Sequence, residues 1–465
     1  MIRKNASPMY GGLFRNILFP FYETRLRGRE TLKDLERLER SQWRSENEIR
    51  DLSFRRMLAA LQFAEQHVPF YRARFAEHGV RAASVKAPED LLRFPVLTRA
   101  DLRAHGQDLL AEGFVGRLYA SGTGGSTGEP VQFRFDHRTY ERRIAAAMRS
   151  DGWAGARLGD RELHLWSTVL VSETLAKKAK RSLHEAILRK KMISAFDLSD
   201  RRLAALLDEI ARYRPQLIVG YASALYHAAR YALSDGRALP APRGIVTSAE
   251  RLFAHQREAI ERAFGAPVFD RYGCRELMLI AAECERHAGK HINMENVFVE
   301  LLRDGRHALP GEPGEVVVTD LVCRSMPLIR YKNQDVAIAA GAPCACGRGL
   351  PMLASVEGRV LDLLVGPDGE LLAGEFFPHL IKDQPTIARY QVHQDRRRAL
   401  TVKLVPGKGF QPETARLIER LVRQHLGERA EICVQIVDEI PLTSGGKHRV
   451  TLSEVPVQLG RGRAA

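Results

Sequence analysis

Residues 216–233, QLIVGYASALYHAARYAL, join an apolar, strand-like run to an amphipathic helical run. This change of pattern recurs along the middle of the chain. Strand-like runs at 163–171, 216–221, 244–247 and 268–272 alternate with helical runs at 201–213, 224–233 and 252–264. Strands separated by helices of this length need crossover connections, which place the strands parallel in one sheet. The sequence therefore predicts an α/β body with mainly parallel sheets.

The segments on either side of this region have other patterns. Charged amphipathic helices are expected at 32–79, and two further strands at 297–302 and 315–321. From about residue 357 the pattern is that of a small α+β module: hairpins at 361–372 and 390–405, a helix at 412–426 and a strand at 431–437. We predict two domains: a body of residues 1–356, helical over about 1–90, and a C-terminal lid of residues 357–465.

Charge and composition narrow the classes of function. The 465 residues include 71 Lys and Arg against 56 Asp and Glu, a net charge of +15. This charge is spread over mixed-sign segments and no recognition motif accompanies it, so we expect a solvated basic surface and no nucleic-acid partner. Six cysteines without an export signal indicate a reducing, cytoplasmic location.

No apolar run is long enough for a transmembrane helix. The apolar stretch 11–22 is interrupted by Arg15 and Pro20 and lacks the cleavage pattern of a signal peptide. We expect it to pack as a satellite of the core, with weak peripheral membrane contact as the alternative.

Three loops have the composition of a nucleotide site. In Ser121-Gly122-Thr123-Gly124-Gly125-Ser126-Thr127-Gly128, the glycines allow close approach of the backbone and the hydroxyls donate, which suits phosphates, although such loops are more often connectors. Glu276 follows a predicted parallel strand and offers carboxylate oxygen to Mg²⁺, while Tyr272 offers a ring for a purine. Lys447 lies in a glycine-rich loop after the last strand and offers a mobile positive charge.

Together and in this order, these segments resemble the core motifs of the adenylate-forming superfamily. The resemblance is strongest to its phenylacetate-CoA ligase branch, which includes CapK-type proteins. It extends from Val68-Pro69-Phe70-Tyr71 through Pro95-Val96-Leu97-Thr98-Arg99-Ala100-Asp101-Leu102 and Ser248-Ala249-Glu250 to Lys447.

The resemblance implies a role for each matching position. The loop Ser121 to Gly128 would hold the ATP phosphates, and Glu276 would bind Mg²⁺ as a catalytic residue together with Lys447. Asp335 would hold the ribose, Asp362 would be the hinge, and the remaining nucleotide-binding positions would be Ser248, Ala249, Glu250, Tyr272, Gly273 and Arg359. The sequence departs from the pattern at Arg275, Asn333-Gln334 and Leu361.

The implied reaction is ATP- and Mg²⁺-dependent activation of an aryl or acyl carboxylic acid to an acyl-adenylate, followed by transfer to CoA. Two alternatives stay open: transfer to an amine or hydroxyl in exopolysaccharide assembly, and a nucleotide-binding homologue without turnover. Aromatic residues at Trp166, Tyr221 and Tyr226 permit an aryl acid. The oligomeric state is undetermined, with a homodimer as one alternative.

Two separated groups of metal-ligand residues suggest a second metal. Cys344 and Cys346 form a Cys-x-Cys element, and Cys284, His287 and His291 lie upstream. Three thiolates and one imidazole suit a closed tetrahedral zinc site, whereas unliganded thiols are the alternative. The resemblance favours structural Zn²⁺ on Cys284, His291, Cys344 and Cys346, with His291 preferred over His287.

Overall fold

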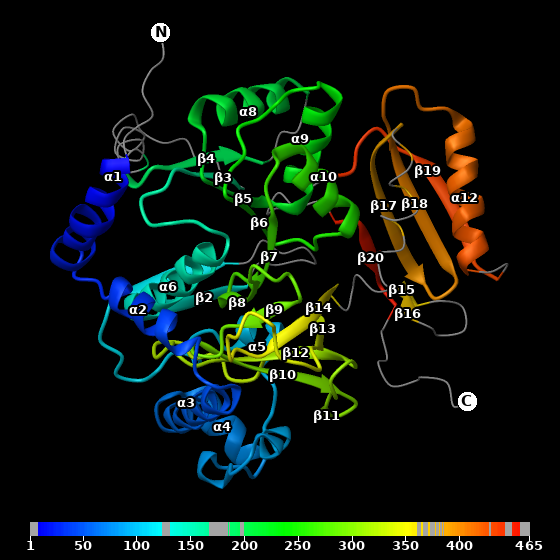
Figure 1. The fold of residues 1–465 in the computed structure, drawn as a ribbon. Helices are drawn as coiled ribbons and strands as arrows, with labels where there is room; N and C mark the ends of the chain where they lie inside the picture. Colours follow the sequence, from blue (N-terminus) through cyan, green and yellow to red (C-terminus); the bar gives the residue numbers. More distant parts are fainter. Residues whose placement is uncertain are drawn as a thin grey trace.

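The computed structural model describes residues 8–122, 131–166, 185, 187–195, 200–359, 364–365, 371–372, 377, 381, 384, 386–426, 429–441 and 449–455. Thr123 to Gly128, Asp362 and Lys447 therefore lie outside the described residues, and of Arg359 only the backbone is described. Figure 1 shows a large body and, beside it, a smaller sheet flanked by a helix, both formed by the C-terminal part of the chain.

The predicted βαβ region forms one half of a 12-stranded sheet. Its strands pair in parallel in the order β4-β3-β5-β6-β7. They are β3 (Glu162–Trp166), β4 (Lys190–Ser194), β5 (Leu217–Tyr221), β6 (Gly244–Ser248) and β7 (Val268–Cys274). The helices that follow β4, β5 and β6 are α8 (Asp200–Tyr213), α9 (Ala222–Ser234) and α10 (Ala254–Phe264). Their apolar faces pack on the strands around Leu207, Ile218 and Ile245, so the predicted alternation is confirmed here.

The other half of this sheet is antiparallel, which differs from the prediction of mainly parallel sheets. From β7 the order continues β8-β9-β14-β13-β12-β10-β11. These strands are β8 (Met278–Glu283), β9 (Lys290–Ile292), β10 (Val297–Arg303), β11 (Arg306–His307), β12 (Pro313–Asp320), β13 (Tyr331–Ala339) and β14 (Met352–Arg359). The linkers between successive strands here contain no helix, and short linkers can join only antiparallel neighbours. Apolar strand patterns do not encode strand direction, so the sequence did not distinguish these strands from the parallel ones.

Helices cover the antiparallel half, and three of them fall in the region around 32–79 where helices were expected. They are α2 (Thr31–Ser41), α3 (Glu46–His67), α4 (Pro69–Glu77), α5 (Arg99–Ala104) and α6 (His137–Trp153). Ser45 and Glu48 form a capping box that starts α3, and Asp136 caps α6 by accepting from the Thr139 amide. Met57 and Leu61 of α3 are fully buried in the core beneath.

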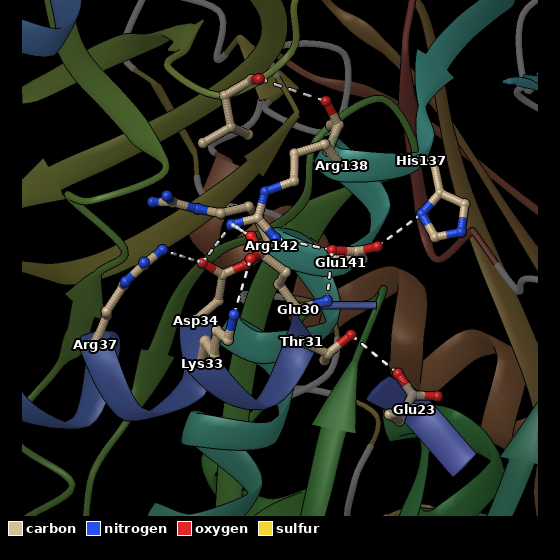
Figure 2. A network of polar contacts seen from close by, with 12 residues as sticks. Glu23, Glu30, Thr31, Lys33, Asp34, Arg37, His137, Arg138, Glu141 and Arg142 are labelled. Carbon is tan, nitrogen blue, oxygen red and sulfur yellow. Dashed lines mark hydrogen bonds and ion pairs between the residues drawn. The ribbon is translucent and has the colours of Figure 1, made fainter. Parts of the chain in front are cut away.

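A polar network joins α2 to α6 (Figure 2). Arg138 donates to Asp34 at 2.7 Å and to Glu141 at 2.8 Å, and Asp34 is only 1% exposed. Glu141 also accepts from the Glu30 amide at the start of α2. Separating α2 from α6 would leave the buried Asp34 carboxylate without its partner, and a buried unpaired charge is strongly destabilising. The N-terminal helical layer is thereby fixed to the body.

The C-terminal module is an α+β unit, as predicted. Its four-stranded sheet has the order β19-β18-β17-β20, and a small ribbon of β15 (Leu364–Val365) and β16 (Leu371–Leu372) precedes it. The other elements are β17 (Ile387–Arg396), β18 (Ala399–Pro406), α12 (Pro412–Leu426), β19 (Glu431–Ile436) and β20 (Thr451–Ser453). Ile418 and Val422 of α12 pack on Val402 and Leu404. None of the described helices is both long and apolar enough to cross a membrane.

Candidate active site

The first two residues of the glycine-rich segment, Ser121 and Gly122, end the first strand of a two-stranded ribbon. β1 (Leu118–Gly122) pairs antiparallel with β2 (Gln132–Asp136), so that Gly122 lies opposite Gln132 and Ser121 opposite Phe133. The Gly122 carbonyl accepts a hydrogen bond of 2.8 Å from Arg275 Nη1. Arg275, which departs from the superfamily pattern, thus joins the base of this loop to the segment that carries Glu276.

Glu276 is a buried carboxylate with one oxygen in use. Its exposure is 1%, its Oε1 accepts from the Tyr331 hydroxyl at 2.7 Å, and Arg99 Nη2 lies 3.7 Å from the same oxygen. Burial and the neighbouring Glu276 raise the pKa of Tyr331, which therefore stays a protonated donor. Glu276 Oε2 is also buried and has no hydrogen-bond donor among the described residues. Such an oxygen suits a hard cation, which replaces the missing donor.

Gly273 allows the tight turn that presents Glu276. β7 and β8 form a hairpin in which Cys274 lies opposite Met278. A Cβ added at Gly273 would lie 1.8 Å from the Met278 carbonyl oxygen, so no side chain fits there. Burial and Glu276 raise the pKa of the Cys274 thiol well above its usual value, which argues against a thiolate nucleophile at this position.

Arg99 is a site residue to which sequence reasoning gave no role. Its segment, residues 95–102, runs beside β13: the Leu97 amide donates to the Arg330 carbonyl at 3.0 Å, and Leu97 accepts from the Lys332 amide at 2.9 Å. Burial disfavours the charge of Arg99, but the neighbouring Tyr331 and Glu276 raise the pKa of its guanidinium above the ordinary value. The sequence signal for Arg99 was the motif at residues 95–102. Its partner, Glu276, could not be predicted, because the two meet only when this segment pairs with β13.

Tyr272, Asn333 and Asp335 form a second cluster beside the first. The Tyr272 hydroxyl donates to Asp335 Oδ2 at 2.8 Å, while Asn333 Nδ2 lies 2.8 Å from the Tyr272 hydroxyl and 2.9 Å from Asp335 Oδ2. Burial and Asp335 raise the pKa of Tyr272, so the phenol remains a donor. Asn333, at a position where the sequence departs from the superfamily pattern, therefore orients the carboxylate predicted to hold a ribose.

The sheet must bend strongly for this cluster to form. β7 and β13 are separated by β8, β9 and β14 in the strand order. On a flat sheet four strand spacings amount to roughly 19 Å, which the two side chains together do not span. The direct bond from Tyr272 to Asp335 thus shows that the antiparallel half folds back toward β7.

Residues 248–250 lie at the carboxyl end of β6, where ligands gather on parallel sheets. Ala249 has a φ of +69° and Gln334 a φ of +71°, a backbone region that non-glycine residues rarely adopt and that is typical of ligand-contacting turns. Glu250 accepts from the Ser223 amide at 2.9 Å, and Arg251 donates to the Glu357 side chain at 3.0 Å. These bonds connect the turn to α9 and to the end of β14.

Cys284, His291, Cys344 and Cys346 converge, although the two pairs lie far apart in the sequence. Their ligand atoms all lie within 4.8 Å of one another. The Cys284 and Cys344 sulfurs are 3.7 Å apart, and Cys346 Sγ lies 3.3 Å from His291 Nε2. Bonds of 2.3 Å to a tetrahedral Zn²⁺ place two sulfurs about 3.8 Å apart, so the cluster fits that ion.

The surroundings of this cluster also suit a metal. His291 Nδ1 donates to the Leu350 carbonyl at 2.8 Å, which leaves Nε2 free of its proton as a ligand. The amides of Arg286 and Arg348 donate to the sulfurs of Cys284 and Cys346 at 3.5 and 3.4 Å. His287 Nδ1 instead lies 3.2 Å from a Glu283 oxygen, and His287 is not a member of the cluster.

The structure thus brings Gly122, Tyr272, Glu276 and Asp335 into one site and places the Ser248–Glu250 turn at the end of β6. Of the aromatic residues considered for an acid pocket, Trp166 and Tyr221 have ring centroids 4.6 Å apart, and Tyr226 meets His255 edge to face at 5.4 Å. They lie at the ends of β3 and β5 and on α9.

Three comparisons identify similar proteins. The model of the CapK C-terminal domain matches residues 364–454. The protein CapK of Staphylococcus aureus is 21% identical over 413 residues, 88% of this chain and 90% of that one. A phenylacetate-coenzyme A ligase of Thermus thermophilus is 27% identical over 331 residues, 68% of this chain and 72% of that one. A crystal structure of 2-hydroxyisobutyryl-CoA ligase in the postadenylation state has a TM-score of 0.69 and 21% identity, covering 86% of this chain and 89% of that one.

Proposed function

We propose that this chain, which is homologous to CapK and to the phenylacetate-CoA ligases, is an adenylate-forming ligase. It would activate a carboxylic acid with ATP, release pyrophosphate and pass the acyl group to CoA. The observation that carries the proposal is Glu276, a buried carboxylate with one oxygen lacking a donor among the described residues, beside the base of the glycine-rich loop. This arrangement suits a nucleotide phosphate and its magnesium ion.

The residues divide the work of the first half-reaction. Mg²⁺ held by Glu276 would neutralise charge on the phosphates, and the loop from Ser121 to Gly128 would orient them. Asp335, oriented by Tyr272 and Asn333, would accept hydrogen bonds from the ribose hydroxyls. Ser248, Ala249 and Glu250 would border the base, and Lys447 would approach the reacting carboxylate. A carboxylate is a poor electrophile, so fixed positive charge and alignment with the α-phosphate provide most of the rate enhancement.

The acceptor in the second half-reaction is CoA in our proposal. The similarity to CapK favours keeping one alternative, transfer to an amine or hydroxyl in exopolysaccharide assembly. The loss of free CoA thiol during turnover separates them, because only thioester formation consumes it. A second alternative, a nucleotide-binding homologue without turnover, predicts ATP binding with no pyrophosphate release under any condition.

The direct test is pyrophosphate release from ATP across a panel of aryl, fatty and sugar acids, with hydroxylamine trapping the activated acyl group. Release that requires one class of acid would support adenylation and identify that class. No release with any acid, with ATP binding confirmed, would contradict the ligase assignment and favour the binding homologue.

The domain division is part of the same proposal. We place the boundary at residue 357, so that residues 1–356 form the nucleotide-binding body and residues 357–465 a mobile lid with Asp362 as the hinge. The separate core of the C-terminal module, around Val392, Val402 and Ile418, supports two units. Rotation of the lid would withdraw Lys447 after the first half-reaction. A cytoplasmic location stays a prediction.

Arg275→Ala should weaken ATP binding more than it slows catalysis. The change removes the bond to the Gly122 carbonyl and so loosens the base of the phosphate loop. Loss of a charged hydrogen bond of this kind should raise KM for ATP by about tenfold and change kcat less. Steady-state kinetics at saturating acid measures both constants. Arg262→Ala, which removes an exposed arginine from α10, is the matched control, and equal kinetics for the two variants would contradict the role of Arg275.

The Cys/His cluster, we propose, holds a structural zinc ion. Three sulfurs and one imidazole leave no ligand position open for a substrate, so the ion would join loops rather than catalyse. The loop between β13 and β14 that carries two of the ligands also packs on the linker between α2 and α3. The Gly349 amide donates to the Gln42 carbonyl at 3.0 Å, and the Arg348 guanidinium lies 4.9 Å from the Trp43 ring centroid.

His291→Ala should release zinc, whereas His287→Ala should retain it. Only His291 points its Nε2 at the cysteines. Losing one ligand of a structural site should lower the melting temperature by about 10 °C, because metal binding is coupled to folding. Zinc content by mass spectrometry and thermal unfolding of both purified variants provide the comparison. Equal zinc content in the two variants, or none in the wild type, would refute the assignment.

A further inference from the structure

The N-terminal helical segment carries a band of exposed apolar side chains. We call this the apolar band; its members, each between 41% and 65% exposed, are Leu13, Ile17, Leu18, Phe21 and Leu26. Five of the twelve exposed large hydrophobic residues in the described part of the chain thus occur within residues 13–26. Single exposed apolar residues are common, but a contiguous group of this size is typical of an interaction surface. The sequence-based expectation that this stretch packs as a satellite of the core is correct only for its inner side.

The helical geometry explains why the band lies on one side. The segment consists of α1 (Pro8–Leu13) and two π-helical stretches, η1 (Phe14–Leu18) and η2 (Phe21–Leu26). Leu13, Ile17, Phe21 and Leu26 follow one another at steps of four, four and five residues. A π-helical turn is wider than an α-helical turn, with hydrogen bonds five residues apart, so these steps bring the side chains to the same face.

The opposite side of the segment is fixed to the body. Phe14 is 2% exposed, and a Cβ added at Gly159 would lie 2.8 Å from its ring. Arg15 Nε donates to the Leu158 carbonyl at 3.2 Å. At the far end Thr31 donates to buried Glu23 at 3.1 Å. The segment lies at the edge of the molecule away from the C-terminal module (Figure 1). The contacts of its inner side leave the apolar band exposed.

The charge around the band restricts what can cover it. Residues 8–29 contain four arginines and one acid, Glu23, which is 4% exposed and paired with Arg29 at 3.3 Å. Arg25 and Arg27 are exposed, and the Arg27 guanidinium lies 5.2 Å from the Tyr22 ring centroid. Two copies of this face would bring arginines together, which opposes self-association. A surface with negative charges above an apolar layer complements both features.

We propose that residues 8–29 dock the protein on an anionic phospholipid surface. The apolar band would enter the boundary between headgroups and acyl chains, while Arg25 and Arg27 contact the lipid phosphates. This is peripheral binding, in which apolar burial and attraction to anionic headgroups act together and neither alone is strong. The inference is independent of the proposed ligase activity, since none of these residues lies in the candidate active site.

Co-sedimentation of the full-length protein with vesicles tests the proposal. One set of vesicles contains phosphatidylcholine alone and the other phosphatidylcholine with phosphatidylglycerol. Binding is expected only to the second set and should weaken as salt is raised. The double variant Ile17→Asp with Phe21→Asp should bind at least about tenfold more weakly, and Arg25→Glu with Arg27→Glu should also lose binding. Leu309→Asp, at a residue that is 61% exposed in the linker between β11 and β12, is the control and should bind like the wild type.

Three results would overturn the proposal. One is wild-type protein that stays in the supernatant with anionic vesicles. Another is unchanged binding by the Ile17→Asp, Phe21→Asp protein. The third is a wild-type dimer in light scattering that this variant converts to a monomer, which would assign the band to a second copy of the chain. Circular dichroism and pyrophosphate release of each variant establish that a loss of binding is not a loss of folding.

Discussion

Glu276→Gln should reduce acid-dependent pyrophosphate release by about a hundred- to a thousandfold. The amide has nearly the same volume, but it has no negative charge and its nitrogen is not a metal ligand. The variant therefore loses the charged carboxylate whose Oε2, without a donor among the described residues, suits Mg²⁺. Activity measured over a range of Mg²⁺ concentrations should show a much weaker metal dependence, or a requirement for far more metal than the wild type needs.

A structural role for Glu276 predicts a different result. Arg99, 3.7 Å away, would lose its ionic partner in a buried place, and such a loss is destabilising by itself. Thermal unfolding of the variant measures this contribution separately. Tyr331→Phe is the matched control, because it removes the hydrogen bond to Glu276 and leaves the carboxylate in place; it should reduce the rate by about tenfold. A Glu276→Gln protein that is destabilised but keeps its wild-type Mg²⁺ dependence would refute the metal assignment.

Lys447→Ala should slow the first half-reaction by about a hundredfold or more while sparing the second. In the proposed mechanism the ammonium stabilises negative charge as the carboxylate attacks the α-phosphate. Thioester formation from a supplied acyl-adenylate does not involve that charge and should continue at close to the wild-type rate. Pyrophosphate release measures the first step, and consumption of the CoA thiol with preformed acyl-adenylate measures the second.

Lys408→Ala is the control for this experiment. Lys408 is an exposed lysine in the turn after β18, in the same module, so its loss changes the charge of the lid by the same amount. Equal pyrophosphate release from the Lys447→Ala and wild-type proteins would show that another residue supplies the charge. Equal losses in both half-reactions would argue for misfolding of the lid rather than for a step-specific lysine.

Several elements were predictable because their signals are local. The helix predicted at 412–426 has the same bounds in the structure, since its apolar positions recur at helical spacing and Ile418 and Val422 are fully buried. The strand and helix alternation around β5, β6 and β7 was recognisable for the same reason. The glycine-rich loop was recognisable from its hydroxyl and glycine content, and its role in holding phosphates stays a prediction, because Thr123 to Gly128 lie outside the described residues.

The functional partners of the site residues had no such signal. Arg99 reaches Glu276 because Leu97 pairs with Tyr331 through backbone atoms, and backbone pairing across more than two hundred residues leaves no side-chain pattern. From the sequence, Asn333 was only a departure from the superfamily pattern. The structure shows that its side-chain amide donates to Asp335 and so orients that carboxylate.

What the sequence by itself determined is therefore the set of chemical groups and the local elements that carry them. The strand directions after β7, the curvature that joins Tyr272 to Asp335 and the exposed apolar band were decided only by the tertiary structure. The structure also places His291, the histidine that the resemblance favoured, in the Cys/His cluster. The physical reason is one of range. Periodicity and backbone preference act between residues a few positions apart, whereas strand pairing and burial depend on contacts between segments that meet only when the whole chain has packed.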